Sequence, residues 1–357
     1  MSSGEATALN HRPDRPLPSR PRILIILMGS LGDVIRGLSL PGAIKQHRPE
    51  SVITWLVEPA CAELVAVHPH VDETIIFDRP QKIKGLRALY RNLSGRDFDV
   101  SLDLQRHFKS GLFSLLARAP RRIGFHRRHA KEFNWLFQTE RLPFEADQLP
   151  KLEQYQQFLD VLELDRTPPV DFGLQSLTVR KTGCGEKPVP LKKPYVALIL
   201  GSSWESKEWF FESYLQLMRL LLSLDDLQLV LLDVPAKTAQ ARGLTKILGS
   251  DRVCNLVGQT SLPELAEVLQ GAELAIGPDC GSGHLTAAVG TAYISLFGPT
   301  AADRTAPCGC LDLVCAAALP CRPCYRRRCP RSDKACMRAI DPDEVFALAC
   351  TLLGRSA

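Results

Sequence analysis

The sequence lacks several features that would place it in a specialised class of protein. The apolar stretch from Ile23 to Met28 is far too short to span a bilayer and is typical of a buried strand instead. Residues 1–21 are polar and proline-rich, without the apolar segment of a secretory signal. We therefore expect a disordered tail at 1–21 and a cytoplasmic protein, whose twelve cysteines would be reduced thiols or metal ligands.

A strong excess of charge of either sign is also absent. The chain has 44 Lys and Arg against 39 Asp and Glu, and a net charge of +5 is too small to indicate a nucleic-acid-binding protein. The basic residues are concentrated instead in two segments, 118–131 and 326–331. Each segment could be a solvated surface, or could face a phosphorylated partner or an anionic membrane surface.

What the sequence does contain is a regular alternation of apolar segments with helical ones. We predict strands at 22–28, 51–57, 73–78, 99–104, 195–200, 227–233, 273–276 and 292–297. Nearly continuous apolar strands that alternate with helices indicate an α/β fold with parallel sheets covered on both faces. At roughly 150 residues per domain, the length of the chain predicts two domains.

A segment rich in proline and glycine interrupts this alternation, and we predict an interdomain linker at 171–193. Rossmann-like domains are expected on either side, at 22–170 and at 194–340. The second would include a cysteine-rich segment, 308–336, and be followed by a C-terminal helix at 341–357. Ligands of open parallel sheets bind beyond the carboxyl ends of the strands, so a shared cleft is expected.

Two loops that directly follow predicted strands carry candidate functional residues. In the first loop, Gly32 allows close approach of the backbone, and Asp33 is either a helix cap or a general base. In the second, Ser202, Ser203 and Lys207 form either an ordinary loop or a diphosphate site, because hydroxyl, backbone N–H and ammonium groups all bind phosphate. The first loop lacks the dinucleotide-binding glycine pattern and the second lacks the P-loop pattern.

A third glycine-rich loop, GPDCGSGH, precedes an alanine-rich helix. Tight turns at the start of a helix favour phosphate binding. Asp279 could bind sugar hydroxyls or cap the helix. His284 could donate to a phosphate oxygen or only support the loop.

Four cysteines near the C-terminus have the spacing C-x2-C-x4-C-x6-C, at Cys321, Cys324, Cys329 and Cys336. Four thiols within such a short segment could form a tetrahedral site for zinc or iron. Only the first pair has a spacing common among metal sites, so free thiols in an arginine-rich loop are the alternative. Further cysteines just upstream leave a different ligand set open.

Together these motifs resemble the lipopolysaccharide heptosyltransferase family, and the cysteine-bearing tail resembles its heptosyltransferase II-like members. The resemblance runs from about Arg22 to Leu353 and rests on RILIILMGSLGDVIRGLSLPGAI, DFDVSLDLQ, RRIGF, SSWESKEW and GPDCGSGHLTAAVGTAYISLFGPTAADRT. It implies a GT-B fold, in which two Rossmann-like domains with parallel sheets face an interdomain cleft. It also implies an inverting transfer of heptose from ADP-heptose to the lipopolysaccharide inner core, with no metal needed for catalysis.

The same resemblance implies roles for individual residues. Asp33 matches the general base of the family, and Lys207 matches the lysine that stabilises the departing ADP. The implied donor-binding residues are Gly32, Ser202, Ser203, Thr260, Asp279, Cys280, Gly281 and His284. The implied acceptor-binding residues are Arg118, Arg121, Arg122 and Arg127. Cys280 replaces a threonine of many members, and because a thiol is a weak donor, a phosphate contact there would come from the backbone.

The expected partners are ADP-heptose and a lipid-linked core oligosaccharide, with peripheral association at the cytoplasmic face of the inner membrane and no nucleic acid. A structural zinc or iron ion at the cysteines is a separate expectation. Two alternatives stay open at this point. One is an autotransporter-type heptosyltransferase with a protein acceptor, and the other is a non-catalytic protein that binds nucleotide sugars.

Overall fold

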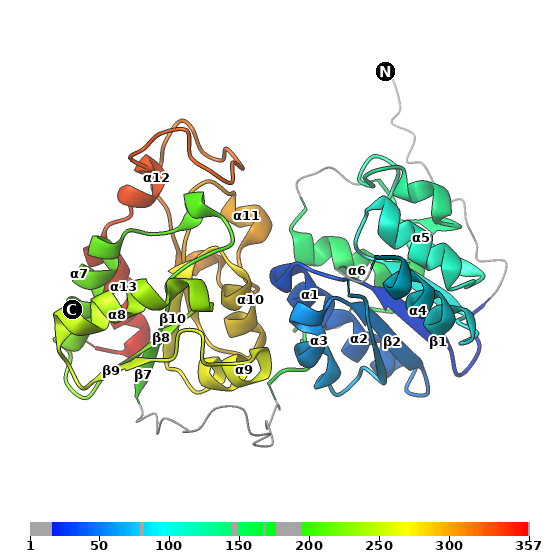
Figure 1. The fold of residues 1–357 in the computed structure, drawn as a ribbon, viewed down its shortest axis with the longest axis horizontal. Coiled ribbons are helices and arrows are strands. Elements are labelled where there is room, and N and C mark those ends of the chain that lie inside the picture. The colour runs from blue at the N-terminus through cyan, green and yellow to red at the C-terminus, as the bar shows by residue number, and fades with distance from the viewer. Residues whose placement is uncertain (1–15, 79–81, 145–148, 167–168, 176–193, 356–357) are drawn as a thin grey trace. The chain divides into compact units, whose positions relative to one another are not determined.

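The computed structural model describes residues 16–78, 82–144, 149–166, 169–175 and 194–355 (Figure 1). Most of the predicted tail and most of the predicted linker lie outside these residues. The chain forms two compact units. The first comprises residues 1–29, 37–149 and 153–171, and the second comprises residues 30–36, 150–152 and 172–357. Two short segments from the N-terminal half are thus grouped with the second unit.

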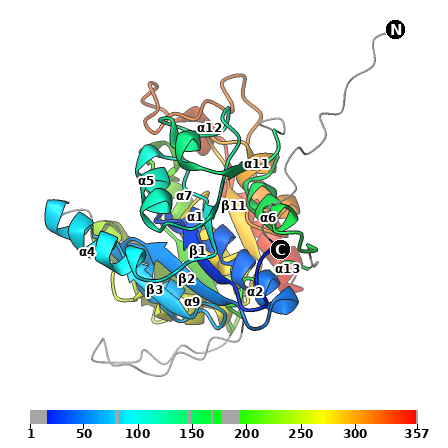
Figure 2. The same ribbon diagram turned by 90° about the vertical axis from the view of Figure 1, so that its right-hand side faces the viewer.

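The first unit is built on a six-stranded parallel sheet with the strand order β3-β2-β1-β4-β5-β6. The strands are β1 (Arg22–Ile26), β2 (Val52–Val57), β3 (Glu73–Ile76), β4 (Val100–Asp103), β5 (Arg121–Gly124) and β6 (Glu140–Arg141). Figure 2 shows β1, β2 and β3 side by side. In the central strand, Ile25 pairs with Trp55 on one side and Leu102 on the other, and all three are buried.

Helices connect these strands, as parallel pairing requires. They are α1 (Leu31–Gly37), α2 (Ser39–His47), α3 (Pro59–Ala66), α4 (Lys82–Ser94), α5 (Phe108–Leu116) and α6 (Lys151–Val161), with a short 3₁₀ helix, η2 (Asn134–Phe137). The helical segment after β1 is divided at Leu38, which separates α1 from α2. Pro41 follows in the first turn of α2, where a missing backbone N–H disrupts no intrahelical hydrogen bond.

The second unit has its own six-stranded parallel sheet, with the order β12-β11-β10-β7-β8-β9. The strands are β7 (Tyr195–Ile199), β8 (Gln228–Leu232), β9 (Val253–Asn255), β10 (Leu274–Pro278), β11 (Tyr293–Leu296) and β12 (Val314–Cys315). The helices are α7 (Phe211–Leu222), α8 (Thr238–Leu248), α9 (Leu262–Gln270), α10 (Gly281–Ala288), α11 (Ala302–Thr305), α12 (Ala335–Arg338) and α13 (Pro342–Leu353), with 3₁₀ turns η3 (Glu205–Lys207), η4 (Pro235–Lys237) and η5 (Leu311–Leu313).

The core of the second unit lies between this sheet and its helices. Tyr214 on α7 is fully buried and donates its hydroxyl to the carbonyl of Ile199, at the end of β7, over 2.7 Å. Helix α9 begins with a capping box, in which Ser261 and Glu264 each bond the backbone N–H of the other. These contacts fix the end of β7 and the start of α9.

The predicted α/β class with parallel sheets is confirmed in both units. Four strands were not predicted, namely β5, β6, β9 and β12. Each has four residues or fewer, and β5 begins with two arginines, so none presents the apolar run on which the prediction depended. Among the described residues, no helix is long and apolar enough to cross a membrane.

Candidate functional site

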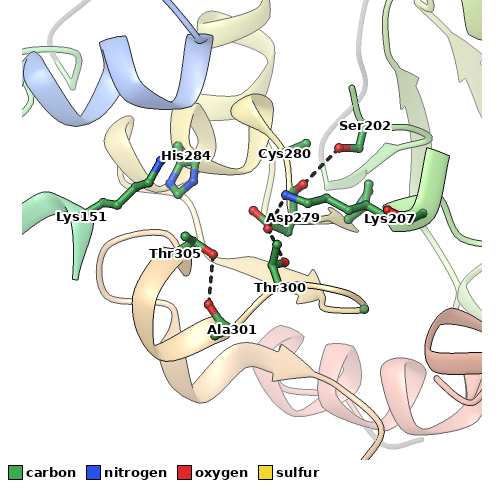
Figure 3. Close-up of polar contacts among 12 residues, drawn as sticks. Lys151, Ser202, Lys207, Asp279, Cys280, His284, Thr300, Ala301 and Thr305 are labelled. Atoms are coloured by element: carbon green, nitrogen blue, oxygen red, sulfur yellow. Dashed lines mark hydrogen bonds and ion pairs between the residues drawn. The ribbon is translucent and has the colours of Figure 1, made fainter. Parts of the chain in front are cut away.

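The carboxyl ends of three neighbouring strands in the second unit bring together side chains that are far apart in sequence. Strands β11, β10 and β7 are adjacent and parallel, so the loops after them emerge at one edge of the sheet. Lys207 Nζ lies 2.6 Å from Asp279 Oδ2, and Thr300 Oγ1 donates to the same oxygen over 2.7 Å (Figure 3). The lysine and aspartate side chains are only 12% and 6% exposed, so this ion pair is largely shielded from water.

Lys207 and Asp279 were predicted as site residues, and the structure places them in direct contact. Thr300 was not among the predicted site residues. It belongs to the loop after β11, whose sequence FGPT follows a strand end in the same way as the other two loops. That position was the signal by which Thr300 could have been found.

The backbone around Asp279 is fixed by neighbouring hydroxyl groups. Ser202 Oγ donates to the carbonyl oxygen of Asp279 over 3.2 Å, as Figure 3 shows. Ser203, by contrast, is exposed. Tyr293 donates its hydroxyl to the carbonyl of Pro278 over 2.8 Å, which holds the end of β10. These two hydrogen bonds hold the backbone at the end of β10, where the loop into α10 begins.

Cys280 occupies the N-cap position of α10, where backbone N–H groups of the first turn lack intrahelical partners. Burial raises the pKa of its thiol to about 11, so the thiol stays protonated at neutral pH. Its sulfur lies 3.7 Å from the Tyr293 hydroxyl. A neutral, weakly polar thiol leaves this helix N-terminus without a competing anion, at a position where backbone N–H groups and the helix dipole favour negative charge.

His284 is buried on α10 and is the neutral acceptor of an arginine. Arg36 Nη2 lies 2.6 Å from His284 Nε2. Because a guanidinium only donates, Nε2 must accept, which puts the ring proton on Nδ1. Burial lowers the pKa of His284 well below its usual value, and the positive charges of Arg36, Lys151 and Lys207 lower it further. His284 therefore positions Arg36 and carries no charge of its own.

Asp33 lies on α1, in a segment grouped with the second unit, and is paired with two cations. Its Oδ1 accepts from Arg36 Nη1 over 3.0 Å and from Lys151 Nζ over 3.1 Å, while Ser30 Oγ donates to Oδ2 over 3.0 Å. Burial alone would raise the pKa of Asp33, but the charges of Lys151 and Arg36 and these hydrogen bonds lower it below its usual value. The carboxylate is ionised at neutral pH.

Lys151 was missed by the sequence analysis. It is separated from Asp33 by 118 residues, and a lone lysine at the start of a helix carries no motif. Gly32, in contrast, was predicted, and its need for glycine is clear. A Cβ at this position would lie 2.8 Å from His284 Cδ2, which is too close for any real side chain.

A buried network in the first unit explains the motif DFDVSLDLQ. Asp103, at the end of β4, accepts hydrogen bonds from Ser110 Oγ at 3.0 Å and Asn134 Nδ2 at 2.7 Å. It also accepts from the backbone N–H of Gln105 at 3.0 Å, and Gln105 Oε1 in turn accepts from the backbone N–H of Met28 at 2.8 Å. The network thus holds the chain just after β1, where it leads into α1 and Asp33.

The four arginines predicted to bind the acceptor differ in their surroundings. Arg121 is buried and forms a two-bond ion pair with Glu140, at 2.7 and 2.8 Å. Arg122 donates to two main-chain carbonyls, those of Phe137 and Ala119. Arg118 and Arg127 are exposed. Arg121 and Arg122 therefore stabilise the edge of the sheet, and the acceptor-binding prediction rests on the two exposed residues.

The four C-terminal cysteines lie in one region but do not form a metal-binding set. Burial raises the pKa of Cys336, and the neighbouring Cys329, Cys321 and Cys324 raise it further, while the charge of Arg322 lowers it. In the part of the chain that the structure describes, no three or more His, Cys, Asp or Glu side chains are placed to hold a metal ion. Cys321 is exposed and Cys336 is buried.

The cysteine-rich segment contacts both loops that carry the Lys207 site. Ser206 Oγ donates to the carbonyl of Arg326 over 2.6 Å, and its backbone N–H donates to Arg327 over 3.2 Å. On the other loop, the backbone N–H groups of Cys324 and Tyr325 donate to the carbonyl of Pro299, next to Thr300. The segment therefore supports the backbone on either side of the ion pair.

Thr260 lies on the loop after β9, two strands away from β7 in the sheet order. It is half-buried. Its implied role in donor binding stays a prediction.

Comparison with known proteins gives matches over most of the chain. A family model described as glycosyltransferase family 9 (heptosyltransferase) matches residues 86–335. Lipopolysaccharide core heptosyltransferase OpsX of Haemophilus influenzae is 25% identical over 302 residues, 82% of this chain and 84% of that protein. Lipopolysaccharide heptosyltransferase 1 of Pseudomonas aeruginosa is 27% identical over 319 residues, 86% of this chain and 87% of that protein.

Among solved structures, E. coli heptosyltransferase WaaC with ADP matches with a TM-score of 0.75 and 22% identity. The match covers 93% of this chain and 99% of that chain. It confirms the predicted GT-B fold.

Proposed function

As a member of glycosyltransferase family 9, the heptosyltransferases, this chain is a glycosyltransferase, and we propose that it transfers heptose from ADP-heptose to the inner core of lipopolysaccharide. The observation that carries the proposal is the shielded arrangement of Lys207, Asp279 and Thr300 beside the N-terminus of α10. A cation and a helix N-terminus at the carboxyl ends of parallel strands suit the diphosphate of a nucleotide sugar.

Asp33 is the general base in this reaction. It takes the proton from the acceptor hydroxyl as that oxygen attacks the anomeric carbon of heptose, and the bond from this carbon to the ADP oxygen breaks with inversion. The two cations that lower its pKa keep it ionised but also make it a weak base. An incoming hydroxyl that displaces Lys151 from Oδ1 would restore basicity at the moment of proton transfer.

Lys207 acts on the leaving group. Negative charge grows on the diphosphate as ADP departs, and an ammonium group in a shielded site offsets that charge more strongly than one in water. Asp279 holds Lys207 in place before the donor binds and can accept hydrogen bonds from heptose hydroxyls. The backbone N–H groups at the start of α10 complete the diphosphate site, since Cys280 contributes only a neutral thiol.

His284 and Gly32 position the base rather than touch the reacting atoms. His284 accepts from Arg36, which in turn holds Asp33 Oδ1. Because Gly32 has no Cβ, the first turn of α1, which carries Asp33, can lie against the imidazole ring. The exposed Arg118 and Arg127 are the residues that bind the phosphates and carboxylates of the core acceptor.

The finer expectations on metal and location are part of this proposal. Zinc and iron both favour thiolate ligands, and on that chemistry the four C-terminal thiols are proposed as the ligands of a structural zinc or iron ion. The described positions of these side chains do not form such a set. The chain works at the cytoplasmic face of the inner membrane, associated with it peripherally. Metal analysis of protein purified without chelators tests the first point, and a substoichiometric content of both metals contradicts it.

The experiment that tests the catalytic assignment separates binding from turnover. Asp33→Asn keeps the shape of the side chain but removes its basicity. We expect it to bind ADP-heptose with unchanged affinity by calorimetry and to lose about 10²–10⁴-fold in turnover of the core acceptor. Unchanged turnover would contradict the assignment of the base. A wild-type chain that binds ADP-heptose but turns over no acceptor would favour the non-catalytic alternative.

A further inference from the structure

A second cation lies beside the Lys207 site. Arg327, in the cysteine-rich segment, places its guanidinium carbon 5.7 Å from the centre of the Trp204 ring. Lys207 Nζ lies 4.5 Å from the centre of the same ring. Cations are attracted to the electron-rich face of an aromatic ring, and tryptophan attracts them most strongly. One indole therefore holds two positive charges close to the shielded ion pair.

Main-chain hydrogen bonds fix Arg327 in this position. The backbone N–H of the buried Ser206 donates to the carbonyl of Arg327 over 3.2 Å, and Ser206 Oγ donates to the carbonyl of Arg326 over 2.6 Å. Ser206 lies on η3, between Trp204 and Lys207 in the sequence. The segment that carries Arg327 is therefore bonded to the turn that carries both the ring and the lysine.

The charges around this ring do not balance. Lys207 is paired with Asp279, so that pair carries no net charge. Arg328, the next cation of the segment, has its Nε 3.7 Å from a carboxylate oxygen of Glu205. The guanidinium of Arg327 forms no ion pair and no hydrogen bond within the part of the chain that the structure describes. The positive charge that is left over at this site is therefore that of Arg327.

An exposed arginine is most often only solvated, and Arg327 is exposed. Its surroundings separate it from that ordinary case. Two like charges beside one ring repel each other, and an anion bound near both of them offsets the repulsion. The N-terminus of α10, which begins directly after Cys280, attracts negative charge to the same strand end. The arrangement therefore favours a bound anion.

The proposed reaction creates an anion of this kind. When the bond from the anomeric carbon to the β-phosphate oxygen breaks, its electron pair stays on that oxygen. The β-phosphate then becomes a terminal phosphate, which carries a charge of about −1.5 to −2 at pH 7 instead of about −1. A guanidinium can bind two oxygens of such a phosphate at once, whereas an ammonium acts as a point charge. The chemistry of Arg327 therefore suits the terminal phosphate.

We propose that Arg327 binds the terminal phosphate of the departing nucleoside diphosphate, and that Trp204 is the positioning residue that holds Arg327 beside Lys207. The proposal rests on the proposed function and adds a second cation to its leaving group. It also gives the cysteine-rich segment a direct part in donor binding, because that segment delivers a charged side chain as well as supporting the backbone. Binding of a nucleotide needs no acceptor, so the proposal can be tested apart from heptose transfer.

The test is calorimetric binding of ADP and of AMP to the full chain, because only ADP has a β-phosphate. We expect Arg327→Gln to weaken ADP binding about ten-fold, the loss of a charged hydrogen-bond donor, and to leave AMP binding unchanged. Arg327→Lys keeps the charge but loses the two-pronged geometry, so it should weaken ADP binding by only about three-fold. With ADP-heptose and the core acceptor, kcat should fall in the same order.

Trp204→Leu tests the positioning role. It keeps an apolar side chain but removes the attraction of the ring for cations, so it should weaken ADP binding about three-fold and leave AMP binding unchanged. The loss should be smaller when Arg327 is already glutamine, because one of the two cations held by the ring is then missing. Equal losses in both backgrounds would show that the ring does not act through Arg327.

The matched control is Arg328→Gln, a neighbouring exposed arginine whose charge is opposed by Glu205, and it should bind ADP like the wild type. Both arginine variants should keep the wild-type Tm, since both side chains are exposed. Unchanged ADP affinity in Arg327→Gln, an equal loss for AMP, or an equal loss in the control would overturn the proposal. A wild type that binds ADP no better than AMP would contradict the proposed donor site as well, whereas a preference for ADP that survives in Arg327→Gln contradicts only the role of Arg327.

Discussion

Replacing Lys207 with methionine is predicted to affect stability and turnover by separate mechanisms. The side chain keeps its approximate length but loses its charge, which leaves Asp279 as a shielded carboxylate without its cation. Removing one partner of a buried ion pair typically costs 3–5 kcal/mol. Because Thr300 Oγ1 still donates to Asp279, we expect the lower end, about 3 kcal/mol.

For a folding unit of the size of the second one, about 3 kcal/mol corresponds to a fall in Tm of roughly 6–12 °C. Turnover should fall further than stability explains, by about 10²–10³-fold in kcat, because the charge that stabilises the departing diphosphate is lost. Thermal unfolding and steady-state kinetics below the transition measure the two effects. Lys246→Met, an exposed lysine on α8, is the matched control and should change neither.

Adding Asp279→Asn to Lys207→Met tells the two effects apart. The double variant has no unpaired carboxylate, so its Tm should lie above that of Lys207→Met, with a coupling free energy of about 2 kcal/mol. Its kcat should stay low, since the cation is still missing. If the double variant regained turnover together with stability, Lys207 would be a structural residue only, and its assigned role on the leaving group would be refuted.

Three further predictions concern the residues around this site. Lys151→Gln removes a charge that lowers the pKa of Asp33, so this pKa should rise. The acidic limb of the kcat/KM–pH profile should then shift to higher pH, and an unshifted limb would contradict the pairing of Lys151 with Asp33. Ser206→Ala breaks the hydrogen bond to the carbonyl of Arg326, costs about 1 kcal/mol, and should raise KM for the donor but not for the acceptor. Arg121→Met breaks the ion pair with Glu140 and should destabilise the protein by about 3 kcal/mol, measured by denaturant unfolding. The KM for the acceptor should stay unchanged, and a raised KM would support the predicted role of Arg121 in acceptor binding.

The sequence was sufficient to place the functional loops but not to show how their side chains pair. Lys207 and Asp279 each follow an apolar strand, and strand ends in a parallel sheet meet at one edge, so their proximity could be expected. Their ion pair joins residues 72 positions apart. No local pattern encodes such a contact, because it depends on which strands become neighbours.

The same limit applies to Asp33. Its position after the first strand could be predicted, but the two cations that set its protonation state could not. Arg36 is one helical turn away and could have been found by its i,i+3 spacing on α1. Lys151 is on a different helix, and only the tertiary structure brings it to the carboxylate.

Basic residues were the least predictable part of the site. Arg118, Arg121, Arg122 and Arg127 look alike in sequence, yet Arg121 is buried against Glu140 and Arg127 is exposed. Short strands decide the difference. Arg121 and its partner Glu140 lie on β5 and β6, neighbouring strands that were too short and too charged to be recognised.

The most direct test of the central claim is a donor and acceptor panel with product mass measurement. Purified wild-type chain would be incubated with ADP-heptose or with UDP- and GDP-sugars, each in the presence of an inner-core acceptor or a polypeptide acceptor. The account predicts a product one heptose heavier than the core acceptor. This product should form only when ADP-heptose is the donor, and should not form with the Asp33→Asn variant. Transfer only to the polypeptide, or from a different nucleotide sugar, would contradict it.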